Sequence, residues 1–279
     1  PVRGGALAWQ PVGGAGLLAL AGAAPLALPG AHPALGGSLL AWASATQITI
    51  ADRASLQPKL VLAAGGVNAL SVSDGWVVYR DEDAQGEHLI AVSLTDPSVR
   101  RQLAGARLAG RIGRPSLDGA SVVFTVDTPE RSAIELVELA GGRRRTLRAA
   151  SRGAAFFNPS LAGGRLLLER VTRCVQQLRL GAVGRPARVG FLAPSHVSRA
   201  SHRSRRERVL LSLPSAVSRD PGYQPGYTHA YNSASGCANR RPGRGAATQL
   251  GATALGAASA YVTKLGPAPG NVEIVSVAR

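Results

Sequence analysis

Apolar residues recur in short, regularly spaced runs along this chain, and a glycine-containing turn follows each run. We take the apolar residue directly before each turn as an anchor, and the anchors are Val2, Leu35, Val72, Leu117, Leu161 and Leu255. Seven positions after each anchor stands another apolar residue, large or branched: Trp9, Trp42, Tyr79, Phe124, Leu168 and Val262. An apolar strand, a tight turn and a second apolar strand together predict a β-hairpin at each repeat.

The spacing of the anchors predicts the architecture. Successive anchors are 33, 37, 45, 44 and 94 residues apart, and the last interval is about two repeats long. Repeats of roughly 40–45 residues with about four short strands are typical of β-propeller blades. Charged and apolar positions alternate in Ile134–Leu139, as in a half-buried strand, and no segment shows a sustained helical period.

The sequence therefore predicts an all-β, six-bladed β-propeller with few or no helices. Five blades are the main alternative, because the first and last repeats are short. A β-sandwich or a β-solenoid also has many short strands, but a sandwich needs no such repeat and solenoid repeats are shorter. The predicted blades span residues 1–31, 32–66, 67–109, 110–150, 151–217 and 246–279 of a single domain, with an expanded fifth blade and a loop insertion at 218–245.

Two of the turns carry a longer motif. Arg114–Gly119 reads RPSLDG, and Asn158–Gly163 reads NPSLAG. Both resemble the Pro-x-x-Ser-Pro-Asp-Gly motif of the TolB-like six-bladed propellers. The spacing agrees over nearly the whole chain, whereas the residues agree in two or three blades. The resemblance implies the fold and a role as a binding platform, and it transfers no catalytic residue.

Charge distinguishes this chain from an average domain, with a formal net charge of +16. Such a charge attracts polyanions at low salt. The basic residues are arginine except for Lys59 and Lys264, and alanine and glycine are also abundant, which indicates the coding bias of a GC-rich genome. No aromatic residues interleave with the arginines as base-stacking platforms, so we expect no sequence-specific nucleic-acid binding.

The amino-terminal region bears on location. Gly14–Pro29 is apolar enough to imitate a signal peptide, but Ala6–Trp9, Leu17–Leu20 and Leu26–Leu28 fall where the strands of a first blade belong. The chain starts at proline, which is typical of a processed product. No apolar stretch reaches 18 residues, so no membrane span is expected. We expect a monomeric bacterial protein exported to the cell envelope or the extracellular space.

Three polar residues occupy one position of the repeat, three residues before the anchor: His32, Arg114 and Asn158. The innermost strand of a propeller blade lines the central channel, so we expect these side chains to meet at the channel mouth. An arginine there favours an anionic ligand. The alternative interpretation is that polar residues simply solvate the channel.

A long stretch with little apolar periodicity, residues 218–248, precedes the last repeat. It carries Tyr223, Tyr227 and His229, and loops of this length in a compact domain are often functional. Because it joins the outer strand of one blade to the inner strand of the next, it belongs to the same face as His32. We predict a lid over the channel mouth that contributes ligand contacts.

The two cysteines, Cys174 and Cys237, are also expected on that face. A cysteine pair in an exported protein favours a disulfide, which would contribute roughly 4 kcal/mol in the chain-entropy model. No CxxC or paired-histidine spacing supports zinc. Asp81–Glu87 resembles the first half of a calcium loop, but the twelfth position is Val92, so we interpret it as a solvated acidic turn. No metal and no cofactor are expected.

Catalytic motifs such as G-x-S-x-G, HExxH and the Walker loop are absent from the sequence. We therefore predict a non-catalytic binding or scaffold module, which engages an unidentified protein or an anionic glycan on the face of the 218–248 loop. The alternative is a polysaccharide lyase or hydrolase that uses His229, Tyr227 and Arg114 for proton abstraction.

Overall fold

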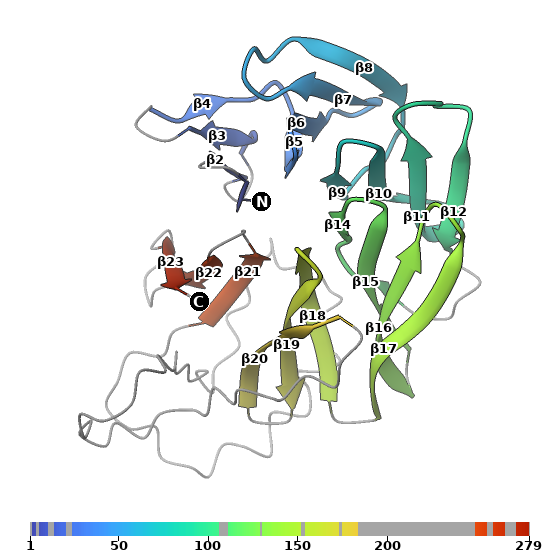
Figure 1. The fold of residues 1–279 in the computed structure, drawn as a ribbon, viewed down its shortest axis with the longest axis vertical. Helices are drawn as coiled ribbons and strands as arrows, with labels where there is room; N and C mark the ends of the chain where they lie inside the picture. Colours follow the sequence, from blue (N-terminus) through green and yellow to red (C-terminus); the bar gives the residue numbers. More distant parts are fainter. Residues whose placement is uncertain are drawn as a thin grey trace.

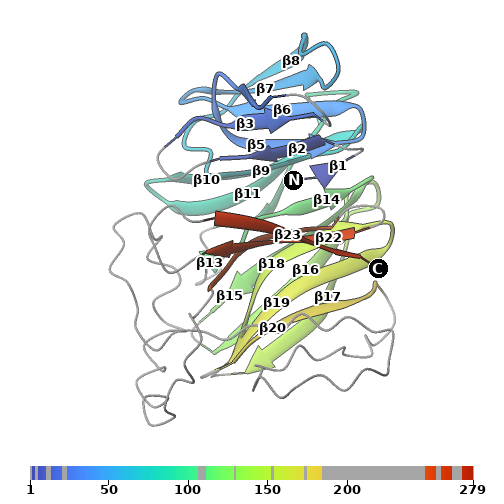
Figure 2. The same ribbon diagram turned by 90° about the vertical axis from the view of Figure 1, so that its left-hand side faces the viewer.

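The computed structural model describes residues 2–3, 6–10, 14–20, 24–105, 111–128, 130–151, 154–172, 175–183, 249–255, 259–265 and 272–278. Within them six antiparallel sheets follow one another along the chain. Figure 1 shows these sheets arranged around a common centre, and Figure 2 shows their strands running from one face of the ring to the other. The predicted all-β propeller is confirmed, while the number of blades in the complete ring stays a prediction. The described residues contain no helix that could cross a membrane.

The sheets are numbered here in chain order. Sheet 1 contains β1 (Val2–Arg3), β2 (Ala6–Trp9), β3 (Leu17–Ala19) and β4 (Leu26–Ala27). Sheet 2 contains β5 (Ala31–Gly36), β6 (Leu39–Ala43), β7 (Gln47–Asp52) and β8 (Pro58–Ala63). Sheet 3 contains β9 (Ala69–Val72), β10 (Trp76–Asp83), β11 (Gly86–Ser93) and β12 (Arg100–Ala104).

The remaining sheets follow the same scheme. Sheet 4 contains β13 (Arg111–Ile112), β14 (Ser116–Asp118), β15 (Ser121–Asp127), β16 (Arg131–Glu138) and β17 (Arg143–Ser151). Sheet 5 contains β18 (Ala154–Ala162), β19 (Arg165–Thr172) and β20 (Val175–Ala182). Sheet 6 contains β21 (Gln249–Leu255), β22 (Ser259–Leu265) and β23 (Val272–Ala278).

Each anchor lies in the first strand of its sheet or, in sheet 4, in β14. These strands lie nearest the centre in Figure 1, where β5 contacts β9, β9 contacts β14, β14 contacts β18 and β18 contacts β21. The apolar stretch Gly14–Pro29 contains β3 and β4, as expected for strands of a first blade. The innermost strand of sheet 4 is interrupted: β13 ends before Gly113-Arg114-Pro115 and β14 begins after it.

The core consists of apolar layers between neighbouring sheets. Four clusters of buried residues join sheets 1 and 2, 2 and 3, 3 and 4, and 4 and 5. Each cluster contains one of the residues seven positions after an anchor: Trp42, Tyr79, Phe124 and Leu168. Burying one such side chain stabilises the fold by about 1.5–3 kcal/mol, so the periodic apolar positions hold one blade against the next.

The serine and aspartate of the turn motif bond neighbouring sheets. Ser71 Oγ accepts a hydrogen bond from Leu117 N at 3.0 Å, and in the same way Ser116 Oγ accepts one from Leu161 N at 2.9 Å. Asp118 Oδ2 accepts a bond from Gly163 N at 2.7 Å. The polar residues of RPSLDG therefore contribute to the assembly of the ring as well as to the local turn.

Candidate ligand-binding site

The backbone at His32 and Asn158 is unusual, and it fixes where these side chains lie. Both residues have a positive φ, 52° for His32 and 47° for Asn158, and a proline follows each. The pairing register of β5 with β6 and of β18 with β19 shifts at these points. A residue in the left-handed region at a bulge interrupts the alternation of a strand and re-aims its side chain. Histidine and asparagine are among the residues that tolerate this conformation.

Arg114 holds the corresponding place in sheet 4. It lies in the break between β13 and β14, directly before Pro115, and it is exposed. The sequence pattern of a polar residue followed by proline thus marks an irregularity of the innermost strand in three sheets. These irregularities lie toward the face opposite the turns that join the first strand to the second. We call the latter the turn face and the opposite one the mouth face.

Positive charge gathers near His32. Burial lowers the pKa of His32, and the charges of Arg114 and of Arg80 lower it further. The imidazole is therefore neutral at neutral pH, and it lies close to two guanidinium groups. Its backbone N donates to Gln10 Oε1 at 2.8 Å, which ties sheet 2 to sheet 1 at this point.

Arg80 is held in place by sheets 3 and 4. Its Nε donates to Asn68 Oδ1 at 2.6 Å, and its Nη1 donates to the carbonyl of Ile112 and lies 3.8 Å from Glu87 Oε1. Glu87 Oε2 in turn accepts a hydrogen bond from Ile112 N at 2.7 Å. Only 11% of the Arg80 side chain is exposed, so this guanidinium is a fixed part of the site.

Asn158 belongs to a different set of contacts. Its Nδ2 donates to Glu169 Oε2 at 3.2 Å. Glu169 is 4% exposed, and burial raises its pKa to about 8, although the bond from Asn158 opposes this rise. At neutral pH this carboxyl is therefore mostly protonated, and it adds little negative charge near the mouth face.

Asp127 is a second carboxyl with a raised pKa. Burial is the main cause, the charge of Glu87 adds to it, and Ser132 and Arg111 oppose it, which leaves a pKa of about 6. Its Oδ1 is buried and makes no hydrogen bond among the described residues. Asp127 pairs with Arg111 across β15 and β13, at the end of these strands that leads to the mouth face.

The acidic segment Asp81–Glu87 forms the turn between β10 and β11. Asp83 Oδ1 accepts a hydrogen bond from Gln85 N at 2.7 Å and lies 3.1 Å from His88 Nε2. These contacts lower the pKa of Asp83, with the Gln85 bond as the largest cause. Among the described residues no group of three potential metal ligands comes together. The Asp83 carboxylate therefore makes its contacts within the β10–β11 hairpin.

The predicted site residues fall into two groups. The structure places His32, Arg114 and Asn158 in or beside the innermost strands, brings the first two within electrostatic reach, and bonds the third to Glu169. Tyr223, Tyr227, His229, Cys174 and Cys237 lie outside the described residues, so the lid, the catalytic alternative and the disulfide stay predictions.

Sequence reasoning missed Arg80 and Glu169. Each was marked by a charge inside an apolar strand, since Arg80 follows Trp76-Val-Val-Tyr79 and Glu169 follows Leu166–Leu168. The available signal was a charged residue directly after the apolar residue that stands seven positions beyond the anchor. The partners of these two residues could not be predicted from their own strands, because Arg80 bonds Ile112 of β13 and Glu169 bonds Asn158 of β18.

No family model matches the sequence, and no curated protein matches it either. Solved structures do match the fold. The crystal structure of TolB from Acinetobacter baumannii superposes with a TM-score of 0.52 and 14% identity, covering 94% of this chain and 59% of that one. This chain therefore spans less than two thirds of the TolB chain.

Two archaeal proteins match to a similar degree. The β-propeller domain of the Trilobed protease from Pyrococcus furiosus has a TM-score of 0.53 and 12% identity, covering all of this chain and 81% of that one. Acylaminoacyl peptidase from Pyrococcus horikoshii has a TM-score of 0.52 and 12% identity, covering all of this chain and 45% of that one. At such identities the likeness concerns the fold alone, and the chain has a TolB-like β-propeller fold.

Proposed function

We propose that this propeller is a non-catalytic binding module, which engages a carboxylate-bearing ligand or partner on its mouth face. The observation that carries the proposal is the grouping of Arg80 and Arg114 near a neutral His32. Arg80 is already bonded within the fold and paired with Glu87, so its role is to fix the walls of the site. Arg114 is exposed, and a guanidinium in that position suits bidentate recognition of a carboxylate.

The neighbouring acids act on these cations in different ways at neutral pH. Glu169 is mostly protonated and adds little negative charge, whereas Glu87 accepts a hydrogen bond from Ile112 N and offsets the charge of Arg80. An imidazole that is neutral can donate or accept one hydrogen bond beside the two cations. The carboxylate could belong to an acidic protein segment or to an acidic glycan, and we retain export to the cell envelope and a monomeric state as parts of the same proposal.

Isothermal titration calorimetry at fixed salt tests the proposal with two probes, a pentaglutamate peptide and an oligogalacturonate. We expect one of them to bind, and Arg114→Ala to weaken that binding about tenfold or more, the loss expected for a charge-assisted hydrogen bond. Arg165→Ala is the matched control, because Arg165 is also exposed but lies at the turn face. Equal affinities of wild type and Arg114→Ala for both probes would refute the proposal.

The lyase alternative is separated in the same experiment. A lyase generates an unsaturated uronate from the oligogalacturonate, which ultraviolet absorbance detects, whereas a binding module leaves the probe intact. Turnover that Arg114→Ala and His229→Ala abolish would replace the binding module with the enzyme.

A further inference from the structure

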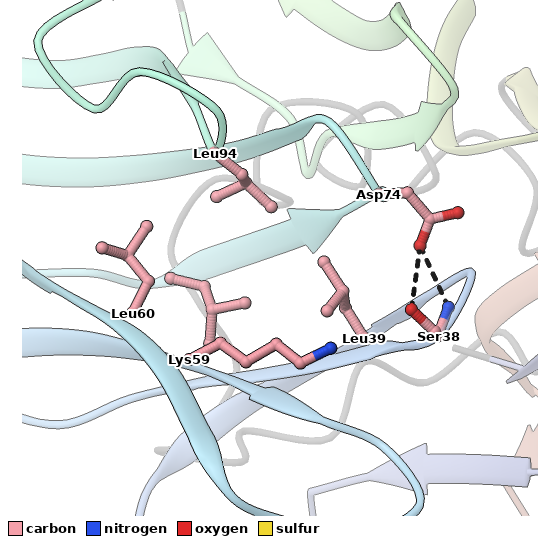
Figure 3. A pocket seen from close by; sticks show the side chains of 7 residues that line it. Ser38, Leu39, Lys59, Leu60, Asp74 and Leu94 are labelled. Carbon is pink, nitrogen blue, oxygen red and sulfur yellow. Dashed lines mark hydrogen bonds between the residues drawn. The ribbon is translucent and has the colours of Figure 1, made fainter.

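A pocket opens between sheets 2 and 3 on the turn face, away from the site proposed above (Figure 3). Its volume is about 340 Å³. Figure 3 shows Leu39 and Leu60 on one side and Leu94 facing them, with the Lys59 side chain running along the floor. The lining residues are Ser38, Leu39, Ile50, Lys59, Leu60, Asp74 and Leu94.

The repeat shows what fills the equivalent space between sheets 3 and 4. Leu39 pairs with the last residue of β7, and Trp76 pairs with the last residue of β11, so these two residues are equivalent. Leu94 and Leu139 are equivalent too, because the N–H of each donates to the turn between the first two strands of its own sheet. The counterpart of the pocket therefore lies between Trp76 and Leu139.

In that counterpart an arginine occupies the space. The guanidinium of Arg101, from the outer strand β12, lies over the Trp76 ring at 5.8 Å from its centroid. Its Nη1 donates to the Leu139 carbonyl at 2.5 Å. The geometry of this fold thus accepts an aliphatic stem and a guanidinium head at this place between two blades.

Sheet 2 lacks these groups. Leu39 replaces the tryptophan, and Leu60 takes the register position of Arg101. The cation of the outer strand β8 is the adjacent Lys59, whose Nζ lies 3.0 Å from Asp52 Oδ2. The Lys59 side chain is 52% exposed and does not fill the space as Arg101 does. The missing ring and the shorter, diverted cation account for a hollow at this interface.

The charges at the pocket favour a cation. Asp74 Oδ1 accepts hydrogen bonds from Ser38 N at 3.0 Å and from Ser38 Oγ at 3.4 Å, while its Oδ2 makes no hydrogen bond among the described residues. Lys59 is neutralised by Asp52, so the Asp74 carboxylate leaves one net negative charge.

We propose that this pocket binds the arginine side chain of a partner protein. Its methylenes would lie against Leu39, Leu60 and Leu94, and its guanidinium would meet the Asp74 carboxylate, in the manner of Arg101 between sheets 3 and 4. The proposal does not depend on the mouth-face site, because none of its residues belongs to that site.

The experiment is an NMR titration of the leucine methyl groups of the whole chain with N-acetyl-arginine amide. We expect saturable shifts of Leu39, Leu60 and Leu94 with about millimolar affinity, as is usual for so small a ligand. N-acetyl-lysine amide should bind at least about threefold more weakly, because an ammonium lacks the planar fork of donors. Absence of saturable shifts, or equal binding of the two probes, overturns the proposal.

Two variants locate the binding. Lys59→Arg places a guanidinium on the chain's own strand, so it should occupy the pocket and weaken probe binding about fivefold or more. Asp74→Asn keeps an acceptor for Ser38 but removes the charge, and it should weaken binding about tenfold. Glu130→Gln is the control, since it removes the same charge from an exposed residue elsewhere.

Failure of these variants to act overturns the proposal. If Lys59→Arg and Asp74→Asn bind the probe as Glu130→Gln does, the shifts arise elsewhere. Lys59 is exposed, so its substitution leaves folding intact and tests the pocket even if Asp74→Asn weakens the turn.

Discussion

Two neighbouring interfaces of this ring have the same backbone arrangement and different contents. Between sheets 3 and 4, Arg101 from β12 donates to the Leu139 carbonyl, and Arg144 from β17 donates back to the Leu103 carbonyl at 3.0 Å. Arg144 also lies 5.5 Å from the centroid of the Phe124 ring. Between sheets 2 and 3, apolar packing and the Asp74–Ser38 bonds hold the blades together, and a pocket remains.

This difference shows that the backbone arrangement of a repeat fold and the packing of its interfaces have different determinants. The anchors and turns place equivalent backbone atoms at each interface, but single side chains decide whether the interface is closed or hollow. It also accounts for part of the arginine content, because Arg80, Arg101 and Arg144 bond carbonyl groups of a neighbouring sheet. These arginines stabilise the ring, and their presence does not imply contact with nucleic acid.

A tight approach of sheet 2 to sheet 3 at Gly36 gives the largest expected effect. A Cβ added at Gly36 would lie 1.7 Å from the carbonyl oxygen of Val72, which is backbone and cannot move aside. We expect Gly36→Ala to lower the free energy of unfolding by about 3 kcal/mol through overpacking. Chemical denaturation measures this change.

Gly75→Ala is the control for that substitution. Gly75 lies in the corresponding turn of sheet 3, and a Cβ there would meet nothing within 4 Å. We expect a change within about 0.5 kcal/mol. Equal effects of the two substitutions would contradict the close approach of Gly36 to the neighbouring sheet.

Buried carboxyl groups sharpen the comparison. Glu135 and Glu169 are each 4% exposed, but Glu135 accepts bonds from Arg144 and Thr146, whereas Glu169 has the neutral amide of Asn158. The pKa of Glu169 rises from 4.5 to about 8, so the folded protein holds a proton that the unfolded chain loses above pH 4.5. Stability therefore falls as the pH rises between these two values.

In the window from pH 6 to 8 Glu169 is the main group that lowers stability, because the pKa of Asp127 reaches only about 6. The lowered pKa of His32 acts in the opposite direction, and it is common to the wild type and Glu169→Gln. We expect the wild type to lose about 2 kcal/mol across this window and Glu169→Gln to lose much less. Denaturant titrations at the two pH values measure both. Parallel losses in wild type and Glu169→Gln would mean that this carboxyl is not the proton-linked group.

We expect the smallest effects from substitutions of two cations beside these interfaces, Arg144 and Lys59. Arg144→Met leaves the buried Glu135 without its positive partner, and we expect a loss of about 1.5 kcal/mol in the free energy of unfolding. Lys59→Met breaks only an exposed ion pair with Asp52, and we expect less than about 1 kcal/mol. In a Glu135→Gln background the cost of Arg144→Met should shrink, and an unchanged cost would contradict the pairing.

Much of the fold could be predicted from the sequence. The apolar positions predicted the strands of sheet 1 at Ala6–Trp9, Leu17–Leu20 and Leu26–Leu28 to within a residue, since side-chain alternation and turn chemistry are local properties. The proline motif also marked the irregular place in the innermost strands, although the break of the strand at Arg114 was not foreseen.

The candidate site was less predictable. His32 and Arg114 could be selected from their position in the repeat, but Arg80 and Glu169 could not, because their roles depend on partners in other strands. The pocket was invisible for the same reason, since its walls come from residues 38–60 and from residues 74 and 94.

The sequence by itself determined the period, the turns and the apolar layers, because each of these depends on residues close together in the chain. Only the tertiary structure decided which charges are neutralised, which carboxyl keeps its proton and where space is left between blades. Those properties depend on distances between side chains on different strands and often on different sheets, and these distances are fixed when the strands pair and the sheets pack around the centre.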